Sequence, residues 1–477
     1  MHGDDPKTHP STLRWIVALS VVAAVLFAIN LTAPPEPPGQ ALGQVQPPFA
    51  ATLPFRRDDS EYTGSDSCRD CHANEHKSWH ASYHRTMTQL MSPETVQAAF
   101  DGQALEFQGE RFTLHRRGDE YWTTIESIDA ASAAPDGRDP EALHLRMGMV
   151  TGSHHMQVFW LPGMKGNLQI GFPFAWLIDD QRWAPRNSLF IRDPHTVISK
   201  ENWNMNCIRC HTTGPQPRPN QAAQRFESRV ADLGISCEAC HGPMKAHVDW
   251  RKEYGETTNK DPTLRKFDNT QWLAACGKCH SRRTELTGDF TPGDRYLDHF
   301  SHVIPDESGI YYADGQVRDE NYVLTSFLGS KMHHAGGRCL DCHEPHSAKI
   351  LQPGNALCMR CHTGTYPNSP KIDPPTHTHH KLNGEGGQCV NCHMPQTTYM
   401  QRDPRRDHGF TIPDPLLTKE HGIPNACNRC HADKDTDWAV AAVEKWYGPR
   451  MDRPTRKRAR TIALAREGAP GSRDNLL

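Results

Sequence analysis

The sequence predicts a mainly α-helical and irregular chain packed around covalently attached groups, with a β-rich insertion and an apolar N-terminal segment. Three observations support this fold class. All 16 cysteines fall into copies of the pattern Cys-x-x-Cys-His, the chain contains 29 histidines, and only 36% of its 477 residues are hydrophobic. A chain of this length normally buries an extensive apolar core of its own. The attached groups are therefore expected to supply much of the missing apolar volume.

The repeated pentapeptide is the attachment site of c-type haem. Its two thiols add to the haem vinyl groups, and the histidine after the second cysteine binds the iron. Zinc knuckles and disulfides also use paired cysteines, but neither requires a histidine directly after every second cysteine. We therefore predict eight covalently bound haem c groups, in a multihaem cytochrome c.

The eight motifs are numbered 1 to 8 in chain order. Their predicted haem-attachment cysteines are Cys68 and Cys71, Cys207 and Cys210, Cys237 and Cys240, Cys276 and Cys279, Cys339 and Cys342, Cys358 and Cys361, Cys389 and Cys392, and Cys427 and Cys430. The predicted proximal iron ligands are His72, His211, His241, His280, His343, His362, His393 and His431. The other histidines are numerous enough to give each iron a second axial imidazole.

The charge of the chain does not indicate a nucleic acid partner. The formal net charge is −3, and the arginines are dispersed apart from a basic tail. Haem propionates would make the holoprotein more acidic still.

An apolar run from Leu13 to Leu31 lies near the N-terminus and is flanked by Lys7 and Arg14. A cleaved signal peptide and an uncleaved anchor are the two interpretations of residues 1–33. The run is longer than a usual signal-peptide core and no clean Ala-x-Ala site follows it, which favours an anchor in the inner membrane. Both interpretations predict export to the periplasm, where covalent haem attachment takes place in bacteria. Residues 34–60 are rich in proline and are expected to form a linker.

The first haem segment, residues 61–92, contains three histidines after motif 1. His76, His80 and His84 are spaced four residues apart, which predicts that they share one face of a helix. At least one of them is expected to bind an iron, with His84 favoured. A solvated histidine face is the alternative.

Residues 93–200 contain no cysteine and are predicted to form a β-rich insertion. The segments 111–115, 121–125 and 156–161 alternate in polarity between Gly, Asp and Pro turns, as strands do. His155, in a histidine pair just before the last of these segments, could reach an iron. A structural role is the alternative for this residue.

Two further haem segments follow, residues 201–338 with motifs 2 to 4 and residues 339–432 with motifs 5 to 8. Histidines are frequent close to these motifs, as His247 and His346 illustrate, which makes bis-histidine ligation the default. Short helices and turns are expected here, with little regular sheet. Residues 433–477 are predicted to form C-terminal helices, one over 436–447 stopped by Gly448 and a basic one over 455–466.

Several runs carry a resemblance to a known family, among them W-N-M-N-C-I-R-C-H-T-T-G, G-I-S-C-E-A-C-H-G-P, C-H-E-P-H-S and C-H-M-P-Q-T-T-Y-M. Over residues 61–450 the chain resembles exported multihaem c-type cytochromes related to the cytochrome c554 and doubled-Cys-x-x-Cys-His groups, which often carry tetratricopeptide or HEAT repeats. The resemblance implies haem binding and electron transfer. It also implies distal iron ligands at His84, His247, His333, His346 and His408.

The resemblance leaves the question of an enzyme open. Multihaem nitrite and tetrathionate reductases mark their catalytic haem with Cys-x-x-Cys-Lys, a pattern that this sequence lacks. Hydroxylamine oxidoreductases cross-link a haem to a tyrosine beyond the last motif, where this chain has Tyr447, but its spacing from Val443 indicates helix packing. We therefore predict an electron carrier between redox protein partners or a quinol-linked donor and an acceptor.

Two alternatives remain. One is a multihaem oxidoreductase acting on a small nitrogen or sulfur compound of the nitrite, hydroxylamine or tetrathionate class at one open haem. His379 or His380 would then be the proton donor, and no catalytic residue is assigned beyond this. The other is a structural cytochrome that assembles into a filament. The sequence does not decide whether the chain forms a homo-oligomer.

Overall fold

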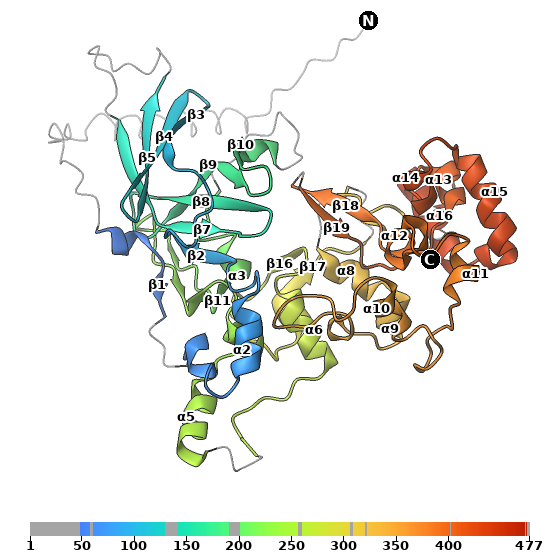
Figure 1. Ribbon diagram of the computed structural model, residues 1–477, viewed down its shortest axis with the longest axis horizontal. Coiled ribbons are helices and arrows are strands. Elements are labelled where there is room, and N and C mark those ends of the chain that lie inside the picture. Colours follow the sequence, from blue (N-terminus) through green and yellow to red (C-terminus); the bar gives the residue numbers. More distant parts are fainter. Residues whose placement is uncertain are drawn as a thin grey trace, which may run out of the picture. The chain divides into compact units, whose positions relative to one another are not determined.

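The computed structural model describes residues 48–57, 61–128, 142–189, 201–255, 260–305, 309–319, 322–400, 402–472 and 474 (Figure 1). Clustering of contacts separates Pro48–Leu477 from Met1–Pro47. The expected N-terminal apolar segment lies in the second of these units and outside the described residues. Within the ranges that the structure describes, no helix is long and apolar enough to cross a membrane.

Two antiparallel sheets occupy the region between motifs 1 and 2. The larger sheet has the strand order β10 (Arg182–Pro185), β9 (Gln169–Leu177), β8 (Met156–Pro162), β7 (Met149–Thr151), β2 (Thr88–Leu90). The smaller sheet has the order β3 (Asp101–Phe107), β4 (Glu110–Arg117), β5 (Glu120–Ser127), β6 (Leu143–Met147). The three segments in which the sequence predicted strands lie in β4, β5 and β8.

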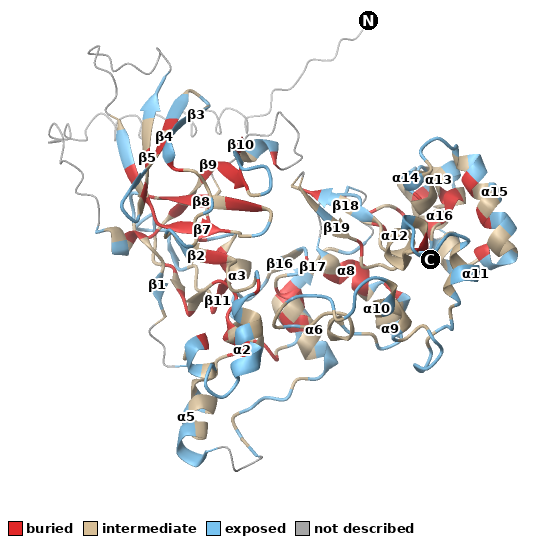
Figure 2. Cartoon of the chain, viewed as in Figure 1, coloured by how far each residue is buried: buried red, intermediate tan, exposed pale blue. Residues whose placement is uncertain are grey.

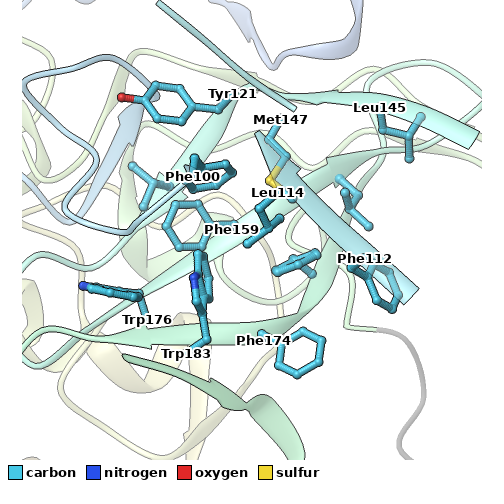
Figure 3. Packing of buried hydrophobic residues seen from close by; sticks show 13 residues of the cluster. Phe100, Phe112, Leu114, Tyr121, Leu145, Met147, Phe159, Phe174, Trp176 and Trp183 are labelled. Atoms are coloured by element: carbon cyan, nitrogen blue, oxygen red, sulfur yellow. The ribbon is translucent and has the colours of Figure 1, made fainter. Parts of the chain in front are cut away.

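The hydrophobic core of the protein lies between these strands, as Figure 3 shows. Alternation in β4 buries Phe112 and Leu114 while their neighbours are partly or fully exposed, as expected for a strand with one apolar face. Phe159 of β8 is fully buried and contacts the rings of Phe100 and Trp183. The buried residues of this cluster are Phe100, Phe112, Leu114, Tyr121, Leu145, Met147, Val150, Phe159, Leu161, Phe172, Phe174, Trp176 and Trp183.

The remaining strands form short two-stranded ladders. They are β1 (Phe55–Arg56) with β14 (Arg229–Val230), β11 (Thr212–Thr213) with β15 (Asp232–Leu233), β12 (Pro219–Asn220) with β13 (Arg225–Phe226), β16 (Arg283–Glu285) with β17 (Phe300–His302), and β18 (Gln396–Tyr399) with β19 (Asp403–Arg406). Only the first of these described pairs is parallel.

The helices are short through most of the motif-bearing region. Those up to motif 5 are α2 (Ala73–His80), α3 (Ile208–His211), α4 (Cys237–His241), α5 (Lys245–Tyr254), α6 (Asn269–Gly277), α7 (Tyr296–His299), α8 (Val323–Leu328) and α9 (Lys331–His334). The later ones are α10 (Asn355–Met359), α11 (Pro374–Thr378), α12 (Cys389–His393), α13 (Pro415–His421), α14 (Ala426–Cys430), α15 (Thr436–Tyr447) and α16 (Pro454–Arg466). The 3-10 turns are η1 (Phe49–Thr52), η2 (Ser65–Cys68), η4 (Arg186–Ser188), η5 (Cys339–Asp341), η6 (Glu385–Gly387) and η7 (Gly448–Met451).

Burial differs sharply between the sheets and the helices that carry the later motifs. Figure 2 shows buried residues concentrated in β7, β8 and β9. By contrast, α10, α11, α12 and α14 contain no buried residue. These helices therefore have no apolar core of their own, in agreement with a fold that is packed around attached groups.

The helix after motif 1 is shorter than the sequence predicted. Helix α2 ends at His80, so His84 does not share a helix face with His76 and His80. The indole of Trp79 donates a hydrogen bond to the Ile235 carbonyl at 2.7 Å, and the His84 carbonyl accepts one from the Ile235 amide at 2.9 Å. These contacts turn the chain after His80 and fix His84 in a position of its own.

The last helices pack on one another as a small unit. Leu417 of α13 lies in one apolar cluster with Ala459 and Ala463 of α16. Beside it, the Arg456 guanidinium donates two hydrogen bonds of 2.7 Å to the Asp414 carboxylate. The two C-terminal helices that the sequence predicted are α15 and α16.

Candidate haem-binding sites

Each motif folds as a single helical turn. In the first motif, the His72 amide donates a hydrogen bond of 2.9 Å to the Cys68 carbonyl, and the same bond joins His431 to Cys427 in the last. This i to i+4 bond brings the first cysteine and the histidine to the same side of the turn. The motif thus presents two thiols and one imidazole together, as covalent attachment and iron ligation require.

The cysteines are not paired with each other as disulfides. All sixteen are free thiols. Nor do the described residues contain a group of three or more His, Cys, Asp or Glu side chains that could hold a metal ion by themselves.

Six of the motif histidines face a second histidine ring from elsewhere in the chain. The ring centroids are separated by 6.0 to 6.5 Å. The pairs are His72 with His247 (6.3 Å), His241 with His346 (6.5 Å), His280 with His84 (6.3 Å), His343 with His408 (6.4 Å), His393 with His377 (6.0 Å) and His431 with His380 (6.1 Å).

This separation fits an iron with two axial imidazoles. Because metal–imidazole bonds are about 2 Å long and the bonding nitrogen lies about 1 Å from the ring centre, such an iron needs ring centres roughly 6 Å apart. Direct ring stacking is closer, as in His154 and His155 at 3.9 Å. The six pairs therefore have the spacing of haem ligands rather than of packed rings.

Burial keeps these imidazoles in the form that binds metal. Desolvation lowers the pKa of His280 to about 4 and also lowers the pKa of its partner His84. Desolvation likewise lowers the pKa of His393 and His408. A neutral imidazole has the free lone pair that an iron requires, so these rings are prepared for ligation at neutral pH.

Two of the partner histidines are hydrogen-bonded to carboxylates. The Nδ1 atom of His247 lies 2.6 Å from Oδ2 of Asp261, and Nδ1 of His346 lies 2.9 Å from Oε1 of Glu344. Desolvation raises the pKa of Glu344, but hydrogen bonds from Ser347 and His346 outweigh it and lower this pKa to about 2. Its carboxylate is therefore ionised, and a ring that donates Nδ1–H to it presents Nε2 for a metal.

Other ligand rings are oriented by backbone carbonyls instead. His393 Nδ1 donates to the Thr411 carbonyl at 2.7 Å, and His408 Nδ1 donates to the Arg406 carbonyl at 2.9 Å. The carbonyl of Thr378 lies 2.5 Å from Nδ1 of His380. Each of these bonds leaves Nε2 free, which is the tautomer that ligation needs.

Cysteines of different motifs lie against each other, so that neighbouring attachment sites adjoin. Side-chain interactions join Cys68 to Cys237, Cys276 to Cys339, Cys358 to Cys389 and Cys210 to Cys279. Helix α4 of motif 3 also packs on α6 before motif 4, and α12 of motif 7 packs on α14 of motif 8. The Arg360 guanidinium of motif 6 donates a hydrogen bond of 2.7 Å to the Asp341 carbonyl of motif 5.

These contacts join the motifs in one series with a side branch. They run as 1, 3, 4, 5, 6, 7 and 8, with motif 2 joined to motif 4. Cys71 and Cys430, in the first and last motifs of this order, are the two exposed cysteines. We call this series of motifs the file; motifs 1 and 8 end its main line, and motif 2 ends the side branch.

Two motif histidines differ from the other six. Among the residues that the structure describes, no histidine ring faces His211 or His362. Burial lowers the pKa of His211 to about 4, and its Nδ1 atom is buried without a hydrogen-bond partner. The segment 190–200, which contains His195 and precedes motif 2, lies outside the described residues.

The predicted distal ligands divide into two groups. His84, His247, His346 and His408 each face a motif histidine, as given above. His155 does not, because its ring lies against His154 and its Nε2 atom is 3.5 Å from Asp403.

His333 also departs from the prediction. It sits in the short helix α9, where its ring contacts Phe327 and His334. The Ser330 side chain caps this helix through the His333 amide. For both His155 and His333, local packing fixes the ring away from the motif histidines that the structure describes.

Two ring partners were not predicted as ligands, His377 and His380. Both belong to the run H-T-H-H at the end of α11, just before motif 7. His379, between them, adopts a left-handed backbone and stacks on Trp446 at 4.4 Å. A run with three histidines ahead of two motifs was the available signal, but the sequence does not show which rings turn inward.

Two family models and two solved structures are similar to parts or most of this chain. Residues 184–242 match the family model described as cytochrome c554 and c-prime, and residues 333–366 match that of the doubled CXXCH motif. The fold is similar to that in the crystal structure of the outer cell wall cytochrome OcwA, with a TM-score of 0.54 and 16% identity over 86% of this chain and 91% of that chain.

Form II of the octaheme sulfite reductase MccA from Wolinella succinogenes is also similar, with a TM-score of 0.40 and 14% identity over 88% of this chain and 78% of that chain. No curated protein matches the chain.

Proposed function

We propose that this chain, a multihaem c-type cytochrome related to cytochrome c554 and to doubled-CXXCH proteins, carries electrons through eight haem c groups. The observation that carries the proposal is the set of six histidine pairs at 6.0 to 6.5 Å. When bound, a haem supplies an iron that accepts and releases one electron. Two axial imidazoles keep such an iron six-coordinate in both states, which favours transfer over substrate binding.

The chain would supply the iron ligands, orient the imidazoles and bring the haem-attachment sites close together. Its motif turns present the thiols and proximal imidazoles, and carbonyls or carboxylates hold the second imidazoles in place. Contacts between motifs, such as Cys68 with Cys237 and Cys358 with Cys389, bring attachment sites together. Redox proteins or a quinol-linked donor are the proposed partners, and electrons would pass between membrane or periplasmic components.

The proposed location is the periplasm, because covalent haem attachment takes place there in bacteria. The apolar run Leu13–Leu31 would direct export and anchor the chain in the inner membrane.

The electron-carrier role is tested on the purified holoprotein. We expect every haem to be reduced by dithionite and reoxidised by an acceptor protein, with no turnover of nitrite, hydroxylamine or tetrathionate in film voltammetry. A catalytic current with any of these compounds would contradict the role as a carrier.

A second candidate function is suggested by His211 and His362, which no histidine ring faces within the described part of the chain. An iron bound there with one protein ligand would be open to a small nitrogen or sulfur compound. Carbon monoxide binding to the reduced protein, compared with the His195→Ala variant, separates the possibilities for motif 2. Equal numbers of carbon monoxide molecules bound by the two proteins support the open site, whereas one additional molecule bound by the variant identifies His195 as the missing ligand.

A further inference from the structure

The second imidazoles at motifs 1 and 3 are supported differently from those at motifs 5 and 8. His247 and His346 are hydrogen-bonded to the carboxylates of Asp261 and Glu344. His408 and His380 are hydrogen-bonded to backbone carbonyls, and at motif 7 the proximal ring, His393, has that kind of support. Motifs 1 and 3 are also the first two motifs of the file.

We propose that Asp261 and Glu344 are positioning residues that give the haems of motifs 1 and 3 the lowest reduction potentials of the file. The proposal rests on the electron-carrier function and adds a direction to it. An electron that enters at motif 1 would then move towards motif 8 with the gradient of potential.

The physical reason lies in the basicity of the axial ligand. A carboxylate that accepts the Nδ1–H bond makes the imidazole more basic, and a more basic ligand stabilises ferric over ferrous iron. A carbonyl does the same only weakly because it carries no net charge. The Asp261 carboxylate is only 1% exposed, so water does little to screen its effect.

Other charged and polar groups surround the two carboxylates. At motif 1, the Arg251 guanidinium lies 3.5 Å from Asp261 and reduces the effect of that carboxylate without removing its hydrogen bond to His247. At motif 3, Glu344 also accepts hydrogen bonds from the Ser78 hydroxyl and the Ser347 amide, which are neutral donors.

Arginines act electrostatically on rings further along the file. Arg405 acts on the ring of His280, Arg450 on that of His377 and Arg453 on that of His393. Positive charge favours the ferrous state and raises the potential. Near motif 8, the carboxylates of Asp433 and Asp437 are each paired with a lysine. Cations also act at motifs 1 and 3, Arg251 on Asp261 and Lys278 on the Cys240 thiol, so the proposed difference rests on the two carboxylates.

The test is a potentiometric titration of the holoprotein followed by EPR, with Asp261→Asn and Glu344→Gln as near-isosteric variants. Glu61→Gln and Glu75→Gln are matched controls, because both acids lie close to motif 1 but outside it, are exposed and have no hydrogen bond to a ligand ring among the described contacts. We expect the components reduced last in the unsubstituted protein to shift to more positive potential in the two variants. One low-spin EPR signal should change in each variant, and the controls should leave potentials and signals in place.

A shift confined to the components reduced first, or no shift, would overturn the proposal. If one variant fails to retain its haems, the shift measured in the other variant tests the proposal, because Asp261 and Glu344 lie in separate segments. Failure of this proposal and failure of the electron-carrier role give different results. Catalytic turnover in the unsubstituted protein would contradict that role and leave the order of potentials intact, whereas unshifted potentials would remove only the direction.

Discussion

The two sheets and the later motif segments are held together in different ways. The strands from β2 to β10 enclose a cluster of thirteen buried apolar and aromatic residues, while helices α10, α11, α12 and α14 bury none. In the sheets, side chains of the protein exclude water from one another. In the motif segments, ligand rings stand about 6 Å apart, a distance that suits an inserted haem and gives little direct packing.

The difference shows that one chain combines two sources of stability. The sheet region resembles an ordinary globular core, whose stability comes from apolar burial. The segments of motifs 5 to 8 depend on groups that the chain binds, so ligand binding and folding are coupled there.

Blocking haem attachment should produce the largest effect. In protein made without haem attachment, we expect residues 339–393 to lose protection against proteolysis while the strands of the larger sheet keep theirs. The reason is that the motif segments then have neither haem contacts nor a core of their own. Limited proteolysis with mass mapping of the fragments measures this, and equal protection of both regions would contradict the account.

Truncating a side chain in the sheet core should destabilise the sheet region and leave the haem-binding segments unchanged. The Phe159→Ala change removes a ring that is 0% exposed and contacts Phe100 and Trp183. It should lower the free energy of unfolding of the sheet region by about 3–5 kcal/mol, without changing the absorption spectrum of the haems. Denaturant unfolding followed by tryptophan fluorescence and by haem absorption separates the two signals. A spectral change at the haems in native conditions would show that the two regions are not independent.

Removing a single second ligand should have a smaller and local effect. His346→Ala is expected to convert one haem from low-spin to high-spin and to create one carbon monoxide site, because His346 faces His241 at 6.5 Å. His333→Ala is the matched control, since its ring contacts Phe327 and His334. EPR and carbon monoxide difference spectra measure both. If the control also produces a high-spin haem, the assignment of His333 to local packing is wrong.

The smallest expected effect concerns helix α15, which is held by ordinary helix chemistry. The Asp435 side chain caps it by accepting a hydrogen bond from the Trp438 amide at 2.8 Å. Asp435→Ala should cost about 1 kcal/mol of stability, while the exposed neighbour Asp433→Ala should cost almost nothing. Thermal unfolding followed by circular dichroism checks the difference, and equal losses would mean that the cap contributes nothing specific.

The sequence predicted the parts of the site that depend on local pattern. Attachment cysteines and proximal histidines follow from one pentapeptide, and the alternating strands from polarity. The partner of each motif histidine was harder to predict, because the two histidines of a pair come from distant parts of the sequence. His84 was singled out as a ligand, yet nothing local indicates that it faces His280 in motif 4.

The errors have local causes as well. Helical spacing suggested that His76, His80 and His84 share a face, but hydrogen bonds to Ile235 end the helix at His80. In the run H-T-H-H, stacking of His379 on Trp446 leaves His377 and His380 to face motif histidines. Tertiary contacts of this kind leave no signal in a single sequence.

The central claim is that histidine pairs hold most of the irons. Quantitative low-temperature EPR of the oxidised holoprotein tests it most directly, because it counts low-spin and high-spin haems separately. We expect at least six low-spin bis-histidine haems, one for each observed pair. Three or more high-spin haems would contradict the pairing and with it the electron-carrier function.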